Sequence, residues 1–219
     1  MKIVLTLLVF ALISTTNIYA QKQIKPKLSK IESLFKKGEL IEAKEISDVS
    51  ISYEKTMNNP KTWYLRGLIY MALDTSASMV GVTSDALQTS LSSFNKSDVL
   101  NEGEDKEPFI TDDVGIPTTK TQQIETYWGF YYNKAATAFG EKDYVEAITS
   151  FNNAALIKPN DTNSVINAGY AAVQAKMYDQ AKNSFYKAIE LGSTERDVRL
   201  ILIYVVSTGQ KLLEESLEI

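Results

Sequence analysis

The chain has 219 residues, of which 44% are hydrophobic, so it has enough apolar material for a folded core and does not resemble a disordered chain. Its formal net charge is −4 and it has no basic stripe, which excludes nucleic acid as an expected partner. Because the sequence contains neither cysteine nor histidine, disulfides, thiolate zinc sites and Ser-His-Asp triads are excluded, and we expect no catalytic residues, no metal site and no cofactor.

Residues 1–20 have the layout of a secretory signal peptide. Lys2 gives a positive start, an apolar run extends from Ile3 to Ile13, and a polar stretch ends at Ala20. The apolar run is too short to span a bilayer, so we expect cleavage and export, with an uncleaved membrane anchor as the alternative. After cleavage, no remaining stretch is long and apolar enough to cross a membrane.

From residue 21 onward the sequence predicts successive pairs of helices. The first pair, at about residues 24–59, has Gly38 at its turn and Ala43 in its second helix. The second pair, at about 60–100, is interrupted by an insert at 74–84 before a helix that contains Phe94. Both pairs are less regular than those that follow.

Residues 101–121 fall outside the helical pattern. They contain six acidic residues, and Pro108, Gly115 and Pro117 break regular structure. We therefore expect a long acidic surface loop. A solvated linker is one interpretation and a calcium site is the other, although the D-x-[DN]-x-[DN]-G spacing of calcium loops is missing.

Two stretches, at about 128–161 and 162–195, repeat at a spacing of 34 residues. The matched positions pair Ala135 with Gly169, Ala138 with Ala172, Tyr144 with Tyr178, Ala147 with Ala181, Phe151 with Phe185 and Ala154 with Ala188. A fixed period with small and aromatic residues at matching places predicts stacked helical hairpins. The small residues let two helices approach closely, and the phenylalanines fill the space between hairpins.

A partial fifth unit covers residues 196–219. Its first part, from Val198 to Val206, is apolar nearly all round, which predicts burial on more than one side. The remaining LLEESLEI provides only a short second helix to cover it. Either this helix caps the array or another chain does, so a homo-oligomer that associates through residues 200–206 is possible.

The order of small, aromatic and proline residues in the two 34-residue stretches resembles the tetratricopeptide repeat. Trp63, Gly67 and Tyr70 also match that family's W-x-x-x-G-x-x-Y pattern, with Arg66 where leucine is usual. The resemblance implies an all-α, right-handed α-solenoid of helix-turn-helix hairpins over residues 21–219. It further implies a non-catalytic scaffold for a protein or peptide partner, similar to small exported repeat proteins of Gram-negative bacteria, in the periplasm or secreted.

In that family, set positions of the first helices line an inner groove. Carried over to this sequence, they give the candidate partner-binding residues Tyr64, Leu68, Tyr132, Asn133, Phe139, Asn167, Tyr170, Gln174 and Tyr204. Asn133 and Asn167 lie one period apart, where peptide-binding relatives often use asparagine to hydrogen-bond an extended main chain. Relatives that grip a C-terminal carboxylate have lysine or arginine where this chain has Ala136, Asn163 and Tyr170. The expected groove is therefore neutral and suits apolar or aromatic segments.

Two other classes of function stay open. A structural subunit of an envelope complex would associate through the C-terminal apolar helix or the acidic loop. An enzyme would need a nucleophile beside a base, and the nearest match is the Ser-x-x-Lys spacing, found at Ser33/Lys36, Ser93/Lys96 and Ser184/Lys187. Because Phe185 and Ala188 occupy core positions, we expect Ser184 and Lys187 on the outer face, and no SDN or KTG motif accompanies them.

Overall fold

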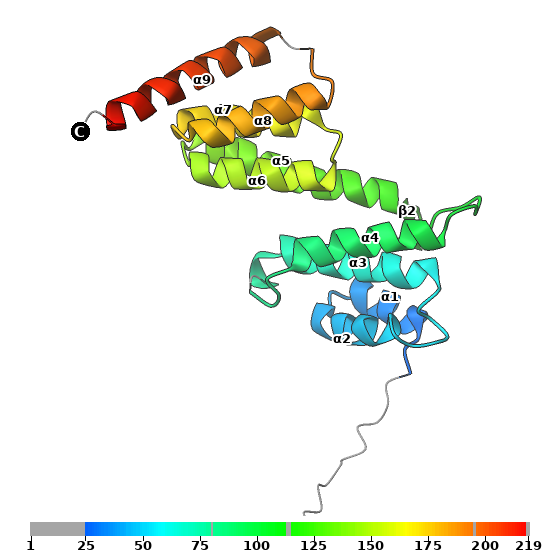
Figure 1. Ribbon diagram of the computed structural model, residues 1–219. Helices are drawn as coiled ribbons and strands as arrows, with labels where there is room; N and C mark the ends of the chain where they lie inside the picture. The colour runs from blue at the N-terminus through cyan, green and yellow to red at the C-terminus, as the bar shows by residue number, and fades with distance from the viewer. Residues whose placement is uncertain (1–24, 80, 113–114, 195, 218–219) are drawn as a thin grey trace, which may run out of the picture.

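The computed structural model describes residues 25–79, 81–112, 115–194 and 196–217. The predicted signal peptide at 1–20 lies outside these residues. The described chain is a stack of helices that begins with α1 and α2 and ends with α9 (Figure 1). Within the described residues, none of the helices combines the length and the hydropathy needed to cross a bilayer.

The helices are α1 (Leu28–Lys36), α2 (Leu40–Ser50), α3 (Pro60–Thr75), α4 (Ala86–Leu100), α5 (Lys120–Gly140), α6 (Tyr144–Ile157), α7 (Thr162–Gln174), α8 (Tyr178–Glu190) and α9 (Arg196–Leu217), with a short 3-10 helix at Ala77–Met79. Strands β1 (Phe109–Thr111) and β2 (Pro117–Thr119) form an antiparallel hairpin in which Ile110 pairs with Thr118. Units one to four are the successive pairs from α1/α2 to α7/α8, and α9 follows as unit five. This arrangement is the all-α solenoid of helical hairpins that the repeat predicts.

The turn between the two helices of a unit has the same backbone conformation in three units. Gly38, Lys142 and Lys176 occupy equivalent places and have φ angles of 74°, 66° and 59°. This left-handed conformation costs a residue with a side chain about 1 kcal/mol. Lys142 and Lys176 adopt this conformation although it is unfavourable for them. The packing of the helices, and not the conformational preference of the turn residue, therefore determines the geometry of the turn.

Small residues bring the two helices of a unit into close contact. A Cβ atom on Gly67 would lie 2.5 Å from the ring of Phe94, and one on Gly169 would lie 2.7 Å from the ring of Phe185. Both distances are too short for a carbon contact, so neither position has room for a side chain. Phe94 and Phe185 therefore pack in the same way against the first helices of units two and four.

Arg66, which stands where the family pattern has leucine, connects units one and two. Its Nε atom lies 3.0 Å from Oδ1 of Asp48 in α2, and its Nη1 atom donates to Oγ of Ser93 in α4 at 2.8 Å. The guanidinium also lies 4.5 Å from the ring centroid of Tyr70, whose hydroxyl donates to Asp48 at 3.0 Å. Leucine would make none of these polar contacts, so the departure from the family pattern has a structural role.

The core consists of two hydrophobic clusters. The first is built mainly from α1 to α4, and the second extends from Ala135 in α5 to Val205 in α9. Asp74, at the start of the predicted insert, joins unit two to unit three because the hydroxyls of Tyr127 and Tyr131 both donate to its Oδ2 atom at 2.6 Å. Burial, followed by these hydrogen bonds, raises the pKa of both tyrosines.

Helix α5 begins at Lys120 rather than near residue 128, where the repeat places the start of unit three. A capping box fixes this earlier start. The backbone N–H of Gln122 donates to the Thr119 side chain, and the Gln122 side chain accepts from the backbone N–H of Thr119. The added turns also bury Tyr127, which is 1% exposed.

Unit five is a single helix, so the prediction of a separate short second helix is wrong. Residues 196–217 contain no proline, and the one glycine, Gly209, costs a helix only about 1 kcal/mol. Helix α9 packs on α8 through Val198 and Val205, which are buried. Its other face is exposed in the single chain, so burial on a second side would require another chain, which is one of the two alternatives that the sequence leaves open.

Candidate functional site

An open groove lies where α5, α6 and α7 meet. It has a volume of about 410 Å³ and is lined by Tyr132, Ala136, Phe139, Phe151, Asn167, Tyr170 and Gln174. Five of these seven residues belong to the predicted binding set, and none of the seven carries a charge. The structure therefore brings together five of the six predicted residues of units three and four in one neutral groove.

The groove walls are held in place by contacts between their own side chains. Asn167 Nδ2 donates to the hydroxyl of Tyr132 at 2.8 Å, which joins α7 to α5. The Tyr132 ring packs edge-on against Phe151 at 5.3 Å between centroids, and Tyr170 packs in the same way against Phe185 at 5.5 Å. These contacts fix the side-chain rotamers before a ligand arrives.

Trp128 packs against the groove residue Tyr132 and does not belong to the predicted binding set. Its ring lies 4.8 Å from the ring of Tyr132, measured between centroids. Its Nε1 atom donates to Asp161 at 3.0 Å and to Ser164 at 3.1 Å, at the start of α7. The spacing of Trp128 four residues before Tyr132 places both rings on one helical face, and this signal was available in the sequence.

The structure does not place the other four predicted residues in the groove. Tyr64 and Leu68 are completely buried in unit two. Asn133 is exposed but lies outside the groove, because the next residue along a helix points about 100° away from Tyr132. Tyr204 is 53% exposed on α9, away from the groove-lining helices.

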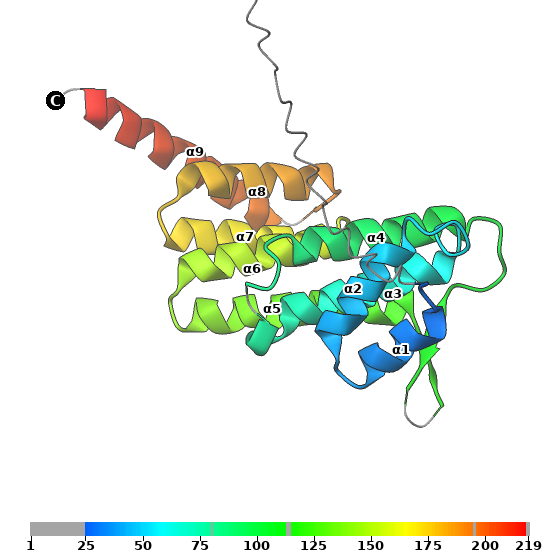
Figure 2. The ribbon, with the colours of Figure 1, turned by 90° about the horizontal axis from the view of Figure 1, so that it is seen from below.

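Tyr64 is buried because the β1–β2 hairpin lies against unit two. The Tyr64 hydroxyl donates to the main-chain oxygen of Thr118 at 2.8 Å, and Ile110 in β1 is buried in the first hydrophobic cluster. Lys36 at the end of α1 donates to Thr111 at 3.1 Å. Figure 2 shows the hairpin beside α1. The segment predicted as an acidic loop thus contains a hairpin that covers the predicted groove residue Tyr64 of unit two.

The environment of Tyr64 is consistent with this burial. Burial raises the pKa of its hydroxyl, and the nearby carboxylates of Glu107 and Glu32 raise it further. A main-chain hydrogen bond from Ile110 opposes the shift. The hydroxyl therefore stays protonated at neutral pH and can act as a hydrogen-bond donor to the hairpin.

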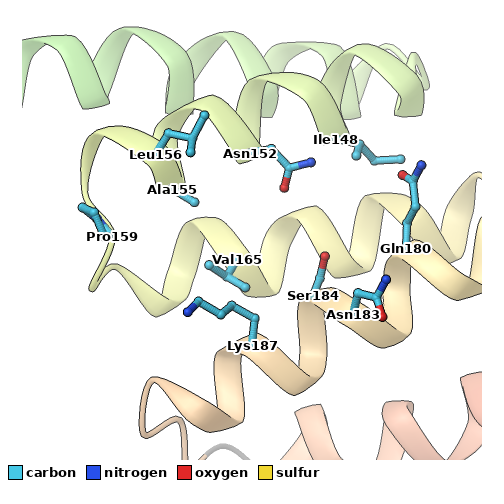
Figure 3. A pocket seen from close by; sticks show the side chains of 10 residues that line it. All are labelled: Ile148, Asn152, Ala155, Leu156, Pro159, Val165, Gln180, Asn183, Ser184 and Lys187. Atoms are coloured by element: carbon cyan, nitrogen blue, oxygen red, sulfur yellow. The ribbon is translucent and has the colours of Figure 1, made fainter. Parts of the chain in front are cut away.

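A second groove lies on the outer face between α6 and α8, with a volume of about 610 Å³ (Figure 3). Its α6 side includes Ile148, Ala155 and Leu156, whereas Gln180 and Lys187 project from α8. This groove has no aromatic wall. No hydrogen bond among the described residues holds its amide side chains in place, so it is a weaker candidate for specific binding.

The Ser-x-x-Lys pair of α8 is the nearest match in the sequence to a nucleophile beside a base. Ser184 and Lys187 both line the outer groove, but no hydrogen bond joins them in the described part of the chain. Among the same residues, no cluster of three or more carboxylates is placed to hold a metal ion. The side chains that converge in the groove of α5, α6 and α7 are mainly aromatic rings and amides.

A model of the family described as "Tetratricopeptide repeat" matches residues 163–191, which cover α7 and α8. The chain contains a tetratricopeptide repeat. The other helical hairpins of the described residues stack with it in an all-α solenoid, and units two and four share the close contact of a glycine with a phenylalanine ring. Solenoids of this kind present extended surfaces, and the fold is that of a protein-interaction scaffold. Tetratricopeptide-repeat proteins are in general non-catalytic.

Two solved structures illustrate what the chain is similar to. One is MamA from residue 41 onward, from Desulfovibrio magneticus RS-1, with a TM-score of 0.36 and 16% identity over 84% of each chain. The other is a chain of the APC/C hetero-tetramer Cut9–Hcn1, with a TM-score of 0.36 and 15% identity. That match covers 81% of this chain and 29% of the other. No curated protein matches the sequence.

Proposed function

We propose that the protein is a non-catalytic scaffold that binds a segment of a partner protein in the groove formed by α5, α6 and α7. The observation that carries this proposal is the hydrogen bond from Asn167 to Tyr132, which joins two repeat units across a neutral, aromatic groove. We also propose that the protein acts in the periplasm or after secretion, because residues 1–20 have the layout of a signal peptide.

Pre-arranged walls make such a groove effective. A rotamer-rich side chain that must be ordered on binding costs about 1 kcal/mol, and the contacts of Tyr132 and Tyr170 with Phe151 and Phe185 remove much of that cost. Aromatic side chains also dominate binding energy at protein interfaces. The groove therefore provides two rigid aromatic anchors beside an amide that orients one of them.

Because the seven residues that line the groove carry no charge, the groove favours uncharged ligands. A C-terminal carboxylate or an acidic side chain would lose water on entering and would find no lysine or arginine among the seven lining residues. Uncharged segments with apolar or aromatic side chains avoid this penalty. The proposed partner is thus recognised through such a segment.

The test uses peptides selected from a random display library on the purified protein. We expect Tyr170→Ala to weaken binding of the selected peptides about 30-fold, the cost of losing an aromatic anchor. Asn167→Ala is expected to weaken it about tenfold because Tyr132 loses its orienting partner. Affinities are measured by fluorescence anisotropy, and circular dichroism checks that each variant is folded.

Asn133→Ala is the matched control for Asn167→Ala. The two asparagines occupy the same repeat position, but only Asn167 lines the groove, so the Asn133 variant should keep its affinity within about twofold. Equal losses in both asparagine variants, or full binding by Tyr170→Ala, would show that the peptides bind elsewhere.

One observation favours a second candidate function, that of a structural subunit in an assembly. Leu200, Ile203 and Tyr204 of α9 are 50%, 66% and 53% exposed. Ile203 stands one period after Gly169, where unit four receives its second helix. If this face mediates self-association, sedimentation should show a concentration-dependent dimer that Ile203→Glu abolishes. A monomer at every concentration would exclude the homo-oligomer.

A further inference from the structure

Tyr64 and Tyr132 occupy the same position in two repeat units. Each precedes by three residues a buried small residue on the same helix, Gly67 in α3 or Ala135 in α5. With units two and three placed from residues 60 and 128, both tyrosines take the fifth position of their units. Their side chains therefore project from α3 and α5 at equivalent places along the solenoid.

In unit two this tyrosine already has an extended segment bound to it. The Tyr64 hydroxyl donates to the main-chain oxygen of Thr118 at 2.8 Å, and Thr118 lies in strand β2. The apolar residue paired with Thr118 across the hairpin, Ile110, is 7% exposed. The chain thus contains one example of how this repeat position recognises another segment, through a main-chain carbonyl and a neighbouring apolar side chain.

In unit three the equivalent tyrosine faces the open groove. The Tyr132 hydroxyl accepts a hydrogen bond from Asn167 Nδ2 at 2.8 Å, and this contact uses a lone pair of the oxygen and leaves its proton free to be donated. No acceptor for that proton is found among the described residues. Next to it, Phe139 and Tyr170 border a volume of about 410 Å³ that can receive an apolar side chain.

We propose that the groove binds an internal, extended and uncharged segment of a partner protein, with one main-chain carbonyl accepting from the Tyr132 hydroxyl. An apolar side chain of the segment enters the space between Phe139 and Tyr170. In this arrangement Tyr132 donates to a main-chain carbonyl of the partner, as Tyr64 donates to the carbonyl of Thr118 in strand β2. This inference rests on the proposed function and adds the backbone conformation, the charge and the hydrogen-bond acceptor of the ligand.

The experiment pairs a change in the protein with a change in the peptide. A peptide whose binding depends on Tyr170 is resynthesised with each main-chain amide in turn replaced by an ester, since an ester carbonyl is a weaker acceptor. We expect one ester position to lower the affinity for the wild-type protein about fivefold, and Tyr132→Phe to lower it by a similar factor. The same ester should then have no further effect on the Tyr132→Phe variant.

Two controls separate the role of the hydroxyl from a general loss of structure. Tyr186→Phe removes a hydroxyl from a half-exposed ring on α8, outside the groove, and should leave the ester scan unchanged. Blocking the peptide's C-terminus as an amide should also leave the affinity unchanged, because the proposed ligand is an internal segment.

The outcomes distinguish this inference from the proposed function. If no selected peptide depends on Tyr170, the groove is not the binding site and the proposed function fails. If peptides depend on Tyr170 but bind as helices, need a free C-terminal carboxylate, or show ester effects that persist in Tyr132→Phe, the function stands and this inference is overturned.

Discussion

Replacing Asp74 with alanine is expected to lower the free energy of unfolding by about 3 kcal/mol. The reason is that Tyr127 and Tyr131, which are 1% and 6% exposed, would both lose their acceptor, and each unsatisfied buried hydroxyl costs about 1–3 kcal/mol. The loss should be measured by urea denaturation followed by circular dichroism. It would be large relative to the total stability of a small domain.

Asp98→Ala is the matched control, because this aspartate forms an ion pair with Lys120 at 2.6 Å but is 52% exposed. Exposed pairs contribute less than about 1 kcal/mol, so this variant should unfold close to the wild type. Adding Tyr127→Phe and Tyr131→Phe to Asp74→Ala should restore part of the stability, since no hydroxyl then lacks a partner. Equal stability of the Asp74 and Asp98 variants would contradict the prediction.

The same cluster makes the stability depend on pH in the alkaline range. The pKa of Tyr127 and of Tyr131 is higher in the folded protein than in the unfolded chain, where it is near 10. The stabilisation is therefore complete below pH about 10 and is lost as the pH rises toward the folded-state values. The deficit of the Asp74→Ala variant should accordingly be measured near neutral pH, where it is fully expressed.

Replacing Gly67 with alanine is expected to lower the free energy of unfolding by about 2 kcal/mol. An added Cβ atom would lie 2.5 Å from two ring carbons of Phe94, a side chain that is 1% exposed and has no space to move into. The strain would separate α3 from α4. Urea denaturation measures the effect, and the near-ultraviolet circular dichroism of the aromatic side chains should change with it.

Gly129→Ala provides the control for this prediction. Gly129 lies inside α5 with no atom within 4 Å of an added Cβ, so alanine should raise the stability by up to about 1 kcal/mol through its higher helix propensity. The double variant Gly67→Ala/Phe94→Leu should be more stable than the sum of the two single changes predicts. Strict additivity would show that the glycine and the ring do not meet.

The helices of units three and four could be predicted because their small and aromatic residues recur at one spacing. That spacing is a direct consequence of stacking, since Gly169 must leave room for the ring of Phe185. The groove residues of these units were predictable for the same reason. Tyr132, Phe139, Asn167, Tyr170 and Gln174 all follow from their positions along regular first helices.

The burial of Tyr64 could not be predicted, because it depends on contacts between residues far apart in the sequence. Tyr64 has the same repeat position as Tyr132, and the hairpin, which returns to unit two 54 residues along the chain, covers its hydroxyl. The early start of α5 was visible in principle, because Thr119 and Gln122 have the spacing of a capping box. Asn133 lies outside the groove because it follows Tyr132 directly and therefore points about 100° away from it around the helix.

The separation of the core into two hydrophobic clusters has a consequence for how the chain opens. In a stack where each hairpin contacts its neighbours, stability is close to a sum of local terms rather than one all-or-none quantity. The groove walls come from α5, α6 and α7, and the first cluster, built mainly from α1 to α4, also includes Tyr131 of α5 and has Tyr132 packed against it. Fraying confined to unit one therefore leaves the Tyr132–Asn167 contact formed, whereas opening of unit two removes packing from one groove wall.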